Sequence, residues 1–337
     1  MGPATRMAEV TPITLVIGLP GAGKTTLLAR LRGAPEMADV AVVAAQPDPP
    51  MWWNAGCPCC APRDDVARAL RAMLPRVRRD EVRRVVIETT GLSDPGPILA
   101  TLLSDTVAAS AYRLDAIVTV VDAVNGEAAL DSHERAVRQV AVADRIVLNK
   151  IDLGDASDLR ARLRRLNPGA PIVAARWGEI DPAVLLVAGL FGSAGGALNV
   201  RGWLDAEAFC DPAQDDAGPA DTREEVPQST HGRDPDIHAF CLTFDGLLPS
   251  RDVTAWLERL ILTHGDALLR IKGILHLQGQ SAPVAIHSIG HLLHPPMPLA
   301  AWPDSDPRHS RLTFITRGLP RATVAAGLPA FADAPAI

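Results

Sequence analysis

Gly18-Leu-Pro-Gly21-Ala-Gly23-Lys24-Thr25-Thr26 is the stretch of sequence that decides the fold. It matches the pattern G-x-x-x-x-G-K-[ST], follows the apolar segment Ile13–Ile17 and opens the helical pattern Lys24–Leu31. In such a loop, backbone N–H groups surround a β-phosphate and the helix N-terminus adds its dipole. Lys24 then serves the β- and γ-phosphates, and Thr25 offers its hydroxyl to Mg²⁺. The predicted contacts of this loop are Gly18, Gly21, Ala22, Gly23, Lys24, Thr25 and Thr26.

Short apolar strands and amphipathic helices alternate from this loop to about residue 190. The predicted strands are Ile13–Ile17, Val40–Ala44, Val82–Glu88, Ala116–Asp122, Arg145–Asn149 and Pro171–Ala174. The predicted helices are Lys24–Leu31, Asp64–Leu74, Gly96–Leu103, His133–Ala141 and Asp158–Leu166. Near-continuous apolar strands separated by helices indicate an α/β fold with a doubly wound, mostly parallel sheet. Its strand-to-helix loops share one edge, where ligands bind.

A carboxylate and a glycine follow the third predicted strand, in Val85-Val-Ile-Glu88-Thr-Thr-Gly91. Glu88 can act on Mg²⁺ or through its bound water, and the Gly91 N–H can approach the third phosphate of a nucleotide. Both residues therefore join the candidate site.

A base-recognition motif, Asn149-Lys150-Ile-Asp152, ends a later strand. The Asp152 carboxylate can accept both N1–H and N2–H of guanine, whereas adenine lacks these donors. Asn149 can read the acceptor edge of the base, and Lys150 can pack its stem on the purine. The motif predicts GTP rather than ATP. Asp122 ends the intervening strand and suits a purely structural role.

Three cysteines are crowded into Gly56-Cys57-Pro58-Cys59-Cys60. In a cytosolic chain they are not a disulfide framework, and three thiolates can converge on one soft cation while leaving a fourth position open. Cys57, Cys59 and Cys60 are therefore the candidate metal ligands, although a redox-active or merely buried trio is the alternative. Cys210 and Cys241 are predicted to be ordinary residues.

Composition excludes several classes of protein. Of the 337 residues, 47% are apolar and 21% are charged, which is typical of a globular chain of about two domains. The net charge is −6 without a basic block, so nucleic acid is not an expected partner. No apolar run is long enough to cross a bilayer, and the apolar N-terminal stretch leads into the glycine loop, so we expect a cytoplasmic protein.

The chain divides into three predicted parts. A P-loop domain with the cysteine motif occupies residues 1–191, and an aperiodic linker rich in Asp, Pro, Gln and Gly occupies 192–236. Residues 237–337 predict a smaller α+β domain. Its strands are Ala239–Phe244, Leu268–Leu277, Val284–Ile289 and Arg311–Thr316, with a helix at Ser250–Thr263.

These motifs in this order resemble the CobW-type metallochaperone GTPases, relatives of the UreG and HypB maturation GTPases. The resemblance covers nearly the whole chain and includes Glu88-Thr-Thr-Gly91-Leu-Ser-Asp-Pro95, Arg270-Ile-Lys272-Gly-Ile-Leu275 and Ser310-Arg-Leu-Thr-Phe-Ile-Thr-Arg317. The Cys-x-Cys-Cys inside a P-loop GTPase is specific to that family. The resemblance implies a CobW-type C-terminal domain and a GTP-dependent protein that carries a transition metal, zinc or cobalt, to a client enzyme.

The chain departs from the family in the segment before the cysteines. Family members have Glu- and Gly-rich switch sequence there, whereas this chain has Ala44-Ala-Gln46-Pro-Asp48-Pro-Pro-Met-Trp-Trp53. Asp48 is the one carboxylate that could take the place of the missing acids. No arginine finger is identifiable, so turnover without metal or client is expected to be slow.

The three lysines of the chain and three C-terminal histidines form a second group of candidates. Lys24, Lys150 and Lys272 are the only lysines in an arginine-rich chain, which suggests sites where a compact ammonium is required. His287, His291 and His294 surround Gly290 and could supply a fourth metal ligand or a docking site, or could simply be polar surface residues.

Two other functions remain open on the sequence. One is a P-loop kinase or ATPase with incidental cysteines, against which the Asn149–Asp152 motif argues. The other is a nucleotide-switched binding module with little turnover, which the altered segment around Asp48 leaves open.

Overall fold

A computed structural model shows two compact units. It describes residues 10–44, 61–89, 91, 95–186, 189, 209, 234, 236–299, 301–302 and 308–326, with only the backbone of 61–65. The first unit comprises residues 1–126, 143–157 and 171–199, and the second comprises 127–142, 158–170 and 200–337. Most of the predicted linker, 192–236, lies outside the described residues.

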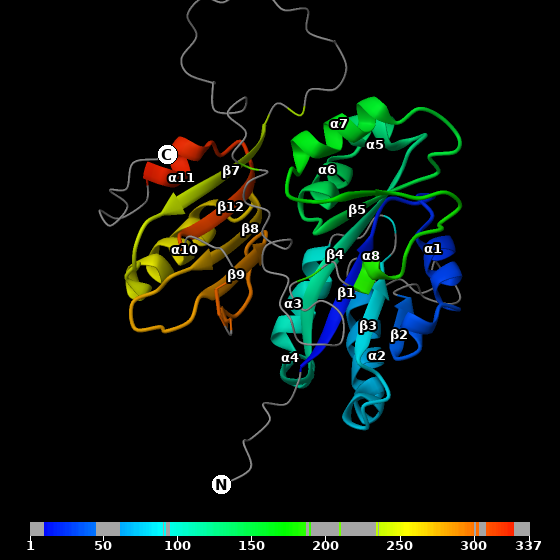
Figure 1. The fold of residues 1–337 in the computed structure, drawn as a ribbon, viewed down its shortest axis with the longest axis horizontal. Coiled ribbons are helices and arrows are strands. Elements are labelled where there is room, and N and C mark those ends of the chain that lie inside the picture. Colours follow the sequence, from blue (N-terminus) through cyan, green and yellow to red (C-terminus); the bar gives the residue numbers. More distant parts are fainter. Residues whose placement is uncertain are drawn as a thin grey trace, which may run out of the picture. The chain divides into compact units, whose positions relative to one another are not determined.

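The first unit contains a six-stranded parallel sheet in the order β2-β3-β1-β4-β5-β6, as predicted (Figure 1). The strands are β1 (Thr11–Ile17), β2 (Val40–Ala44), β3 (Arg84–Glu88), β4 (Tyr112–Asp122), β5 (Arg145–Asn149) and β6 (Ile172–Ala174). The helices are α1 (Lys24–Leu31), η1 (Pro35–Met37), α2 (Ala61–Arg78), α3 (Pro95–Ser104), α4 (Thr106–Ala111) and α8 (Ala183–Leu186).

The apolar strands form the core of this unit. Every side chain of β3 is buried, and so is nearly every side chain of β1 and β4. Leu27, Leu28 and Leu31 on one face of α1 pack in a cluster with Val86 and Val118 from the sheet. Burial of strands along their whole length explains the continuous apolar runs in the sequence.

Strand β4 begins at Tyr112, four residues before the predicted start at Ala116. The additional residues include polar side chains that would be unfavourable in a buried strand, but tertiary contacts satisfy them. Tyr112 is buried, and its hydroxyl donates to the Leu70 carbonyl at 2.8 Å. Asp115 is fully buried against Arg84, with 2.6 Å between Oδ2 and Nη1. Arg84 also donates to the Thr14 hydroxyl at 3.0 Å.

Removal of the Asp115 carboxylate should therefore destabilise the fold strongly. Asp115→Ala leaves a buried guanidinium without this partner, which costs on the order of 3–5 kcal/mol. Urea denaturation should show a lower midpoint at an unchanged slope. The exposed pair Arg83–Asp39, 3.9 Å apart, supplies the control Asp39→Ala, whose effect should be small. Equal midpoints for the two variants would contradict this assignment.

The second unit contains an antiparallel sheet in the order β10-β9-β8-β12-β7, with β11 paired to β9, so the predicted α+β class is confirmed. Its strands are β7 (Ile237–Phe244), β8 (Leu268–Leu275), β9 (Val284–Ile289), β10 (Leu292–Leu293), β11 (Met297–Pro298) and β12 (Ser310–Arg317). Its helices are α10 (Ser250–His264) and α11 (Arg321–Ala326), and α6 (Glu134–Ala141) and most of α5 (Gly126–Ser132) and α7 (Ser157–Leu166) also group with it.

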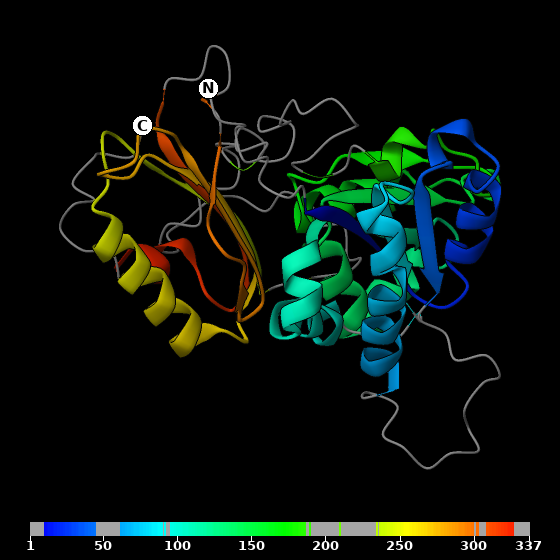
Figure 2. The ribbon, with the colours of Figure 1, turned by 90° about the horizontal axis from the view of Figure 1, so that it is seen from below.

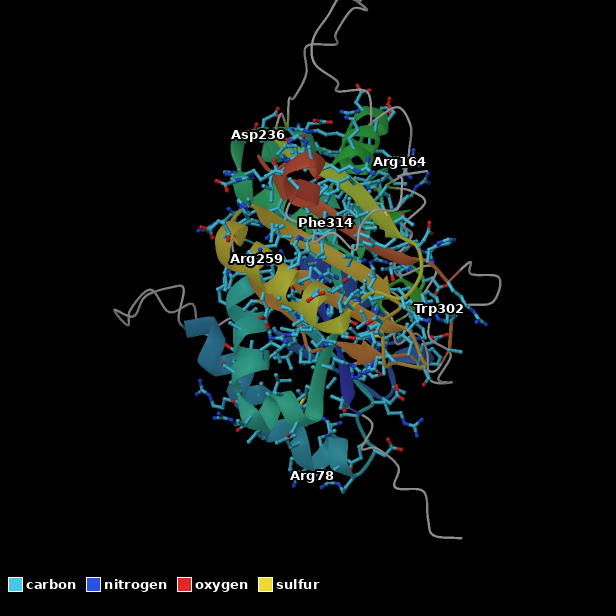
Figure 3. The ribbon with its side chains drawn as sticks, turned by 90° about the vertical axis from the view of Figure 1, so that its left-hand side faces the viewer. Arg78, Arg164, Asp236, Arg259, Trp302 and Phe314 are labelled. Carbon is cyan, nitrogen blue, oxygen red and sulfur yellow. The ribbon has the colours of Figure 1, made fainter. Side chains whose placement is uncertain are left out.

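Helix α10 packs on one face of this antiparallel sheet (Figure 2). Trp256 contacts Phe314 edge-on at 6.2 Å between ring centroids, and Phe314 stacks on Phe240 at 5.2 Å. Figure 3 marks Phe314 on the sheet and Arg259 on α10, where Arg259 is exposed. Alternate residues of β7 (Phe240, Leu242, Phe244) and of β12 (Leu312, Phe314) belong to the same buried cluster, so one face of these strands packs against α10.

One arginine ties three segments of the second unit together. Arg162 is buried on α7 and binds Glu127 and Asp131 of α5 at 2.8 and 2.7 Å. It also binds Asp234, ahead of β7, at 2.8 Å. The hydrogen bond to Asp234, followed by those to the α5 carboxylates, raises the pKa of Arg162 above its already high value.

Among the helices of the described ranges, none is long and apolar enough to cross a membrane.

Candidate nucleotide-binding site

The glycine loop occupies the turn between β1 and α1, at the carboxyl edge of the sheet. Gly23, at the start of α1, has φ of 98°, a conformation that L side chains rarely adopt. A Cβ atom at this position would lie 2.3 Å from the Asn149 amide nitrogen. Glycine is thus required both by the backbone of the loop and by the side chain of the base-recognition motif.

The ammonium of Lys24 lies within its own loop. It is buried, and its Nζ donates to the carbonyls of Gly18 at 2.7 Å and Leu19 at 3.1 Å. Burial lowers the pKa of Lys24, and the nearby Glu88 carboxylate partly opposes this shift. The ammonium is therefore held at the loop by two backbone carbonyls of that loop.

Thr25 and Glu88 face each other from α1 and the end of β3. The Thr25 hydroxyl donates to Glu88 Oε1 at 2.5 Å, and Glu88 is buried. Mg²⁺ prefers oxygen ligands in a compact octahedral shell and is usually held by one or two protein groups together with phosphate oxygens. One hydroxyl and one carboxylate fit that requirement.

Gly91 lies against the glycine loop from the segment after β3. A Cβ atom on Gly91 would fall 2.2 Å from the Pro20 backbone nitrogen and 2.7 Å from the Leu19 carbonyl carbon. Only glycine permits this approach without a backbone shift, so the structure brings the two predicted phosphate-binding segments into direct contact.

Asn149 connects the base-recognition motif to two other segments. Its buried amide donates to the Ala22 carbonyl at 3.0 Å, and its Oδ1 accepts the Gly178 N–H at 3.1 Å. The side chain predicted to read the base edge is thus also a brace between the glycine loop and the turn after β6.

Lys150 is paired with Asp122, whose role the sequence left as structural. The Lys150 Nζ lies 2.8 Å from Asp122 Oδ2, and Lys150 has φ of 62°. Burial alone would raise the pKa of Asp122, but hydrogen bonds from Lys150, Asn125 and Val124 outweigh it and hold the pKa below its ordinary value. The pair orients the lysine stem, and the register partners Asp122 and Asn149 explain the proximity.

The remaining predicted residues fall into three groups. Asp152 is exposed in the turn after β5, beside Lys150. Asp48 and the candidate metal ligands Cys57, Cys59 and Cys60 lie outside the described residues, and within the described part no group of three or more His, Cys, Asp or Glu is placed to hold a metal. Cys241 is buried in β7.

The C-terminal candidates lie in the second unit. Lys272 is buried on β8, with Thr313 and His287 as its register partners on the neighbouring strands. The rings of His287 and His294 stack with centroids 4.1 Å apart.

The turn at residues 176–179, which follows β6 at the same edge of the sheet, is not among the predicted site residues. Its Gly178 N–H binds Asn149, and Glu179 pairs with Arg30 of α1 at 2.6 Å. Its position directly after a predicted parallel strand indicates a place near the ligand, because loops after parallel strands lie at the edge of the sheet where ligands bind.

Two family models match successive parts of the chain. Residues 12–174 match the CobW/HypB/UreG nucleotide-binding domain, and residues 237–332 match the cobalamin synthesis protein CobW C-terminal domain. The zinc chaperone YjiA of Escherichia coli is 29% identical, over 93% of this chain and 96% of YjiA. The crystal structure of the Zn(II)-bound YjiA GTPase from E. coli matches with a TM-score of 0.65 at 26% identity, over 94% of this chain and 98% of that one.

A mutant of YjiA adds a second comparison. The Zn(II)-bound triple mutant, in which one Glu and two Cys are replaced by Ala, matches with a TM-score of 0.65 at 27% identity, over 94% of this chain and 98% of the mutant.

Proposed function

Because this chain belongs to the CobW-type family of P-loop GTPases, we propose that it hydrolyses GTP and carries zinc to a client protein. The observation that carries the proposal is the convergence of the glycine loop, Glu88, Gly91 and Asn149 at one edge of a parallel sheet. The kinase or ATPase alternative loses support, since YjiA is described as a GTPase.

Each nucleotide group has its own contact in this proposal. Lys24 and the loop N–H groups bind the β- and γ-phosphates, and the Gly91 N–H approaches the third phosphate. Asp152 selects guanine, and the Lys150 stem, fixed by the ion pair with Asp122, packs on the base. Thr25 and Glu88 would hold Mg²⁺, which neutralises phosphate charge when it is bound.

Zinc is the proposed cargo, and the three thiols are its proposed ligands. Zinc is tetrahedral and binds thiolates well, so Cys57, Cys59 and Cys60 would leave one position open for transfer. Zinc is favoured over cobalt because YjiA is described as a zinc chaperone. The zinc-bound YjiA mutant lacks two cysteines, so a relative can bind zinc without those two thiols. An experiment on this chain must therefore distinguish zinc at the three cysteines from zinc bound elsewhere.

The path of the chain supports coupling between the proposed metal and nucleotide sites. Strand β2 ends at Ala44, which is the register partner of Glu88, and Glu88 binds Thr25. In the sequence the three cysteines follow Ala44 and precede Ala61, where α2 begins. Nucleotide contacts at Glu88 and Thr25 would therefore lie next to the strand that precedes the cysteines, which is where the nucleotide-dependent loops of P-loop GTPases occur.

Zinc affinity should therefore depend on the nucleotide. We expect zinc to bind about 5- to 150-fold more tightly with a non-hydrolysable GTP analogue than with GDP, which is the usual range of coupling between sites. By linkage, zinc should raise the affinity for the GTP analogue relative to that for GDP by the same factor. Competition against a zinc chelator, with the analogue, with GDP and with neither, measures both effects.

Matched cysteine variants identify the zinc involved. The triple variant Cys57→Ser, Cys59→Ser, Cys60→Ser should lose one zinc equivalent and all of the nucleotide dependence. Cys241→Ser removes a buried thiol of β7 and should change neither. Zinc affinities that ignore the nucleotide, or a triple variant that behaves like the wild type, would refute the proposed cargo site.

A further inference from the structure

An exposed tryptophan occupies the tip of the turn that Asn149 holds. Arg176 and Glu179 form the closing bridge of this turn, and the Glu179 N–H donates to the Arg176 carbonyl at 2.8 Å. Trp177 has φ of 54° and Gly178 has φ of 77°, the left-handed pair of a type I′ turn. The Trp177 residue is 64% exposed.

Tryptophan is a poor choice for this backbone conformation. Type I′ turns favour Asn or Asp followed by Gly, because a bulky L residue at positive φ is strained. Strained residues that the surrounding structure holds in place occur preferentially at ligand sites. Neither the fold nor solubility explains a large apolar side chain that is both strained and exposed.

The surrounding contacts fix where Trp177 is presented. Gly178 is bound by Asn149, and a Cβ atom on Gly178 would contact the α1 backbone at Leu27, 3.0 Å away. Glu179 is paired with Arg30 of the same helix. The turn is therefore tied to the base-recognition motif on one side and to the helix of the glycine loop on the other.

Other exposed apolar side chains lie in the loops that follow the neighbouring strands. Val124 follows β4 and is 52% exposed, and Leu153 follows β5 directly after Asp152 and is 60% exposed. With Trp177 after β6, three adjacent strands each present an apolar residue at the edge where Asp152 lies. A flat aromatic ligand suits such an edge better than a charged one.

We propose that the Trp177 indole stacks on the guanine base and forms one wall of the base pocket, with the Lys150 stem as the other. This inference rests on the proposed function, because it requires a guanine nucleotide at Asn149–Asp152. Stacking recognises the face of a base and not its edge. Trp177 therefore supplies affinity, while Asp152 supplies the choice of guanine.

Binding of GDP and of a GTP analogue by Trp177 variants tests the stacking. Trp177→Ala and Trp177→Asn should each raise the Kd of both nucleotides about 5- to 150-fold, as loss of stacking on one base does. The ratio of the two Kd values and the preference for guanine over adenine nucleotides should not change. Trp177→Phe keeps an aromatic face and should bind more tightly than Trp177→Ala.

The Asn variant separates stacking from a structural role. Because Asn suits positive φ, Trp177→Asn should keep or raise the melting temperature while nucleotide binding weakens. A structural role alone predicts the reverse, with affinity unchanged. Trp177→Asn that binds GDP as tightly as the wild type therefore overturns the inference.

Fluorescence gives an independent readout. GDP should quench tryptophan emission of the wild type, and Trp177→Phe should remove that change. Trp302, which contacts His276 in the second unit, provides the control Trp302→Phe, in which the change should persist. If the wild type binds no guanine nucleotide, the proposed function is contradicted. If the wild type binds GDP and the Trp177→Phe variant shows the same full quench, only the stacking is contradicted.

Discussion

Asp152→Asn is expected to abolish the preference of this protein for GTP over ATP. Asp152 is exposed in the turn after β5, and its carboxylate can accept both N1–H and N2–H of guanine. An amide at this position would place an N–H group against a guanine donor. Sites built on such hydrogen bonds discriminate by about 10⁴ or more, and that factor should be lost.

Rescue by a modified base makes the test specific. Xanthine carries an oxygen where guanine carries its 2-amino group, so the side-chain amide of the Asp152→Asn variant could donate to that oxygen while accepting N1–H. Titration calorimetry should show that Asp152→Asn prefers XTP to GTP. Asp155 is a matched control in the same loop, because Asn can replace it as a partner of Ser157 at the start of α7. Asp155→Asn should keep the GTP preference, and equal affinity of the wild type for GTP and ATP would contradict the assignment of Asp152.

Lys24→Ala is expected to abolish GTP hydrolysis. Lys24 holds its ammonium at the loop through the Gly18 and Leu19 carbonyls, where the β- and γ-phosphates are expected. Removal of one such electrostatic contact costs about 10²–10³ in turnover. GTP binding should also weaken more than GDP binding, because the ammonium serves the γ-phosphate as well. Phosphate release under saturating GTP measures the first effect, and calorimetry measures the second.

Lys24→Arg tests why this position is lysine in an arginine-rich chain. The space between the two loop carbonyls holds a compact ammonium, and a planar guanidinium fork differs from it in shape and in its donor directions. We therefore expect Lys24→Arg to be as inactive as Lys24→Ala despite its charge. Substantial turnover by Lys24→Arg would show that charge alone is required at this position.

Periodicity and motif spacing determined most of the elements of this protein. Strands β2, β5 and β9 and helix α1 have the ends that the sequence predicts, because local apolar patterns and the Gly23-Lys24 boundary mark them. The parallel sheet, the α+β class of the C-terminal part and the position of each nucleotide motif after a strand also follow from the sequence. These features depend on neighbouring residues, whose side-chain period and capping chemistry are local.

The polar contacts were harder to infer. From the sequence, a charged residue such as Asp115 argues against a buried strand. In the structure Asp115 lies inside β4 because Arg84 of β3 pairs with it. Helix α4 has no apolar signal of its own, but Asp105 caps it by accepting from the Val107 and Ala108 N–H groups. In both cases an aspartate is accommodated by donors that it contacts in the folded structure: the Arg84 guanidinium for Asp115, and two backbone N–H groups for Asp105.

Only the tertiary structure decided which segments meet at the site. Uniformly apolar parallel strands carry no alternation that specifies their neighbours, so the order that places Ala44 beside Glu88 is set by packing of the whole sheet. The contact of Gly91 with Pro20, the Asp122–Lys150 pair and the bracing of the Trp177 turn by Asn149 all follow from that order. Each joins residues far apart in the chain, and the free energy of such contacts exists only once the sheet has formed.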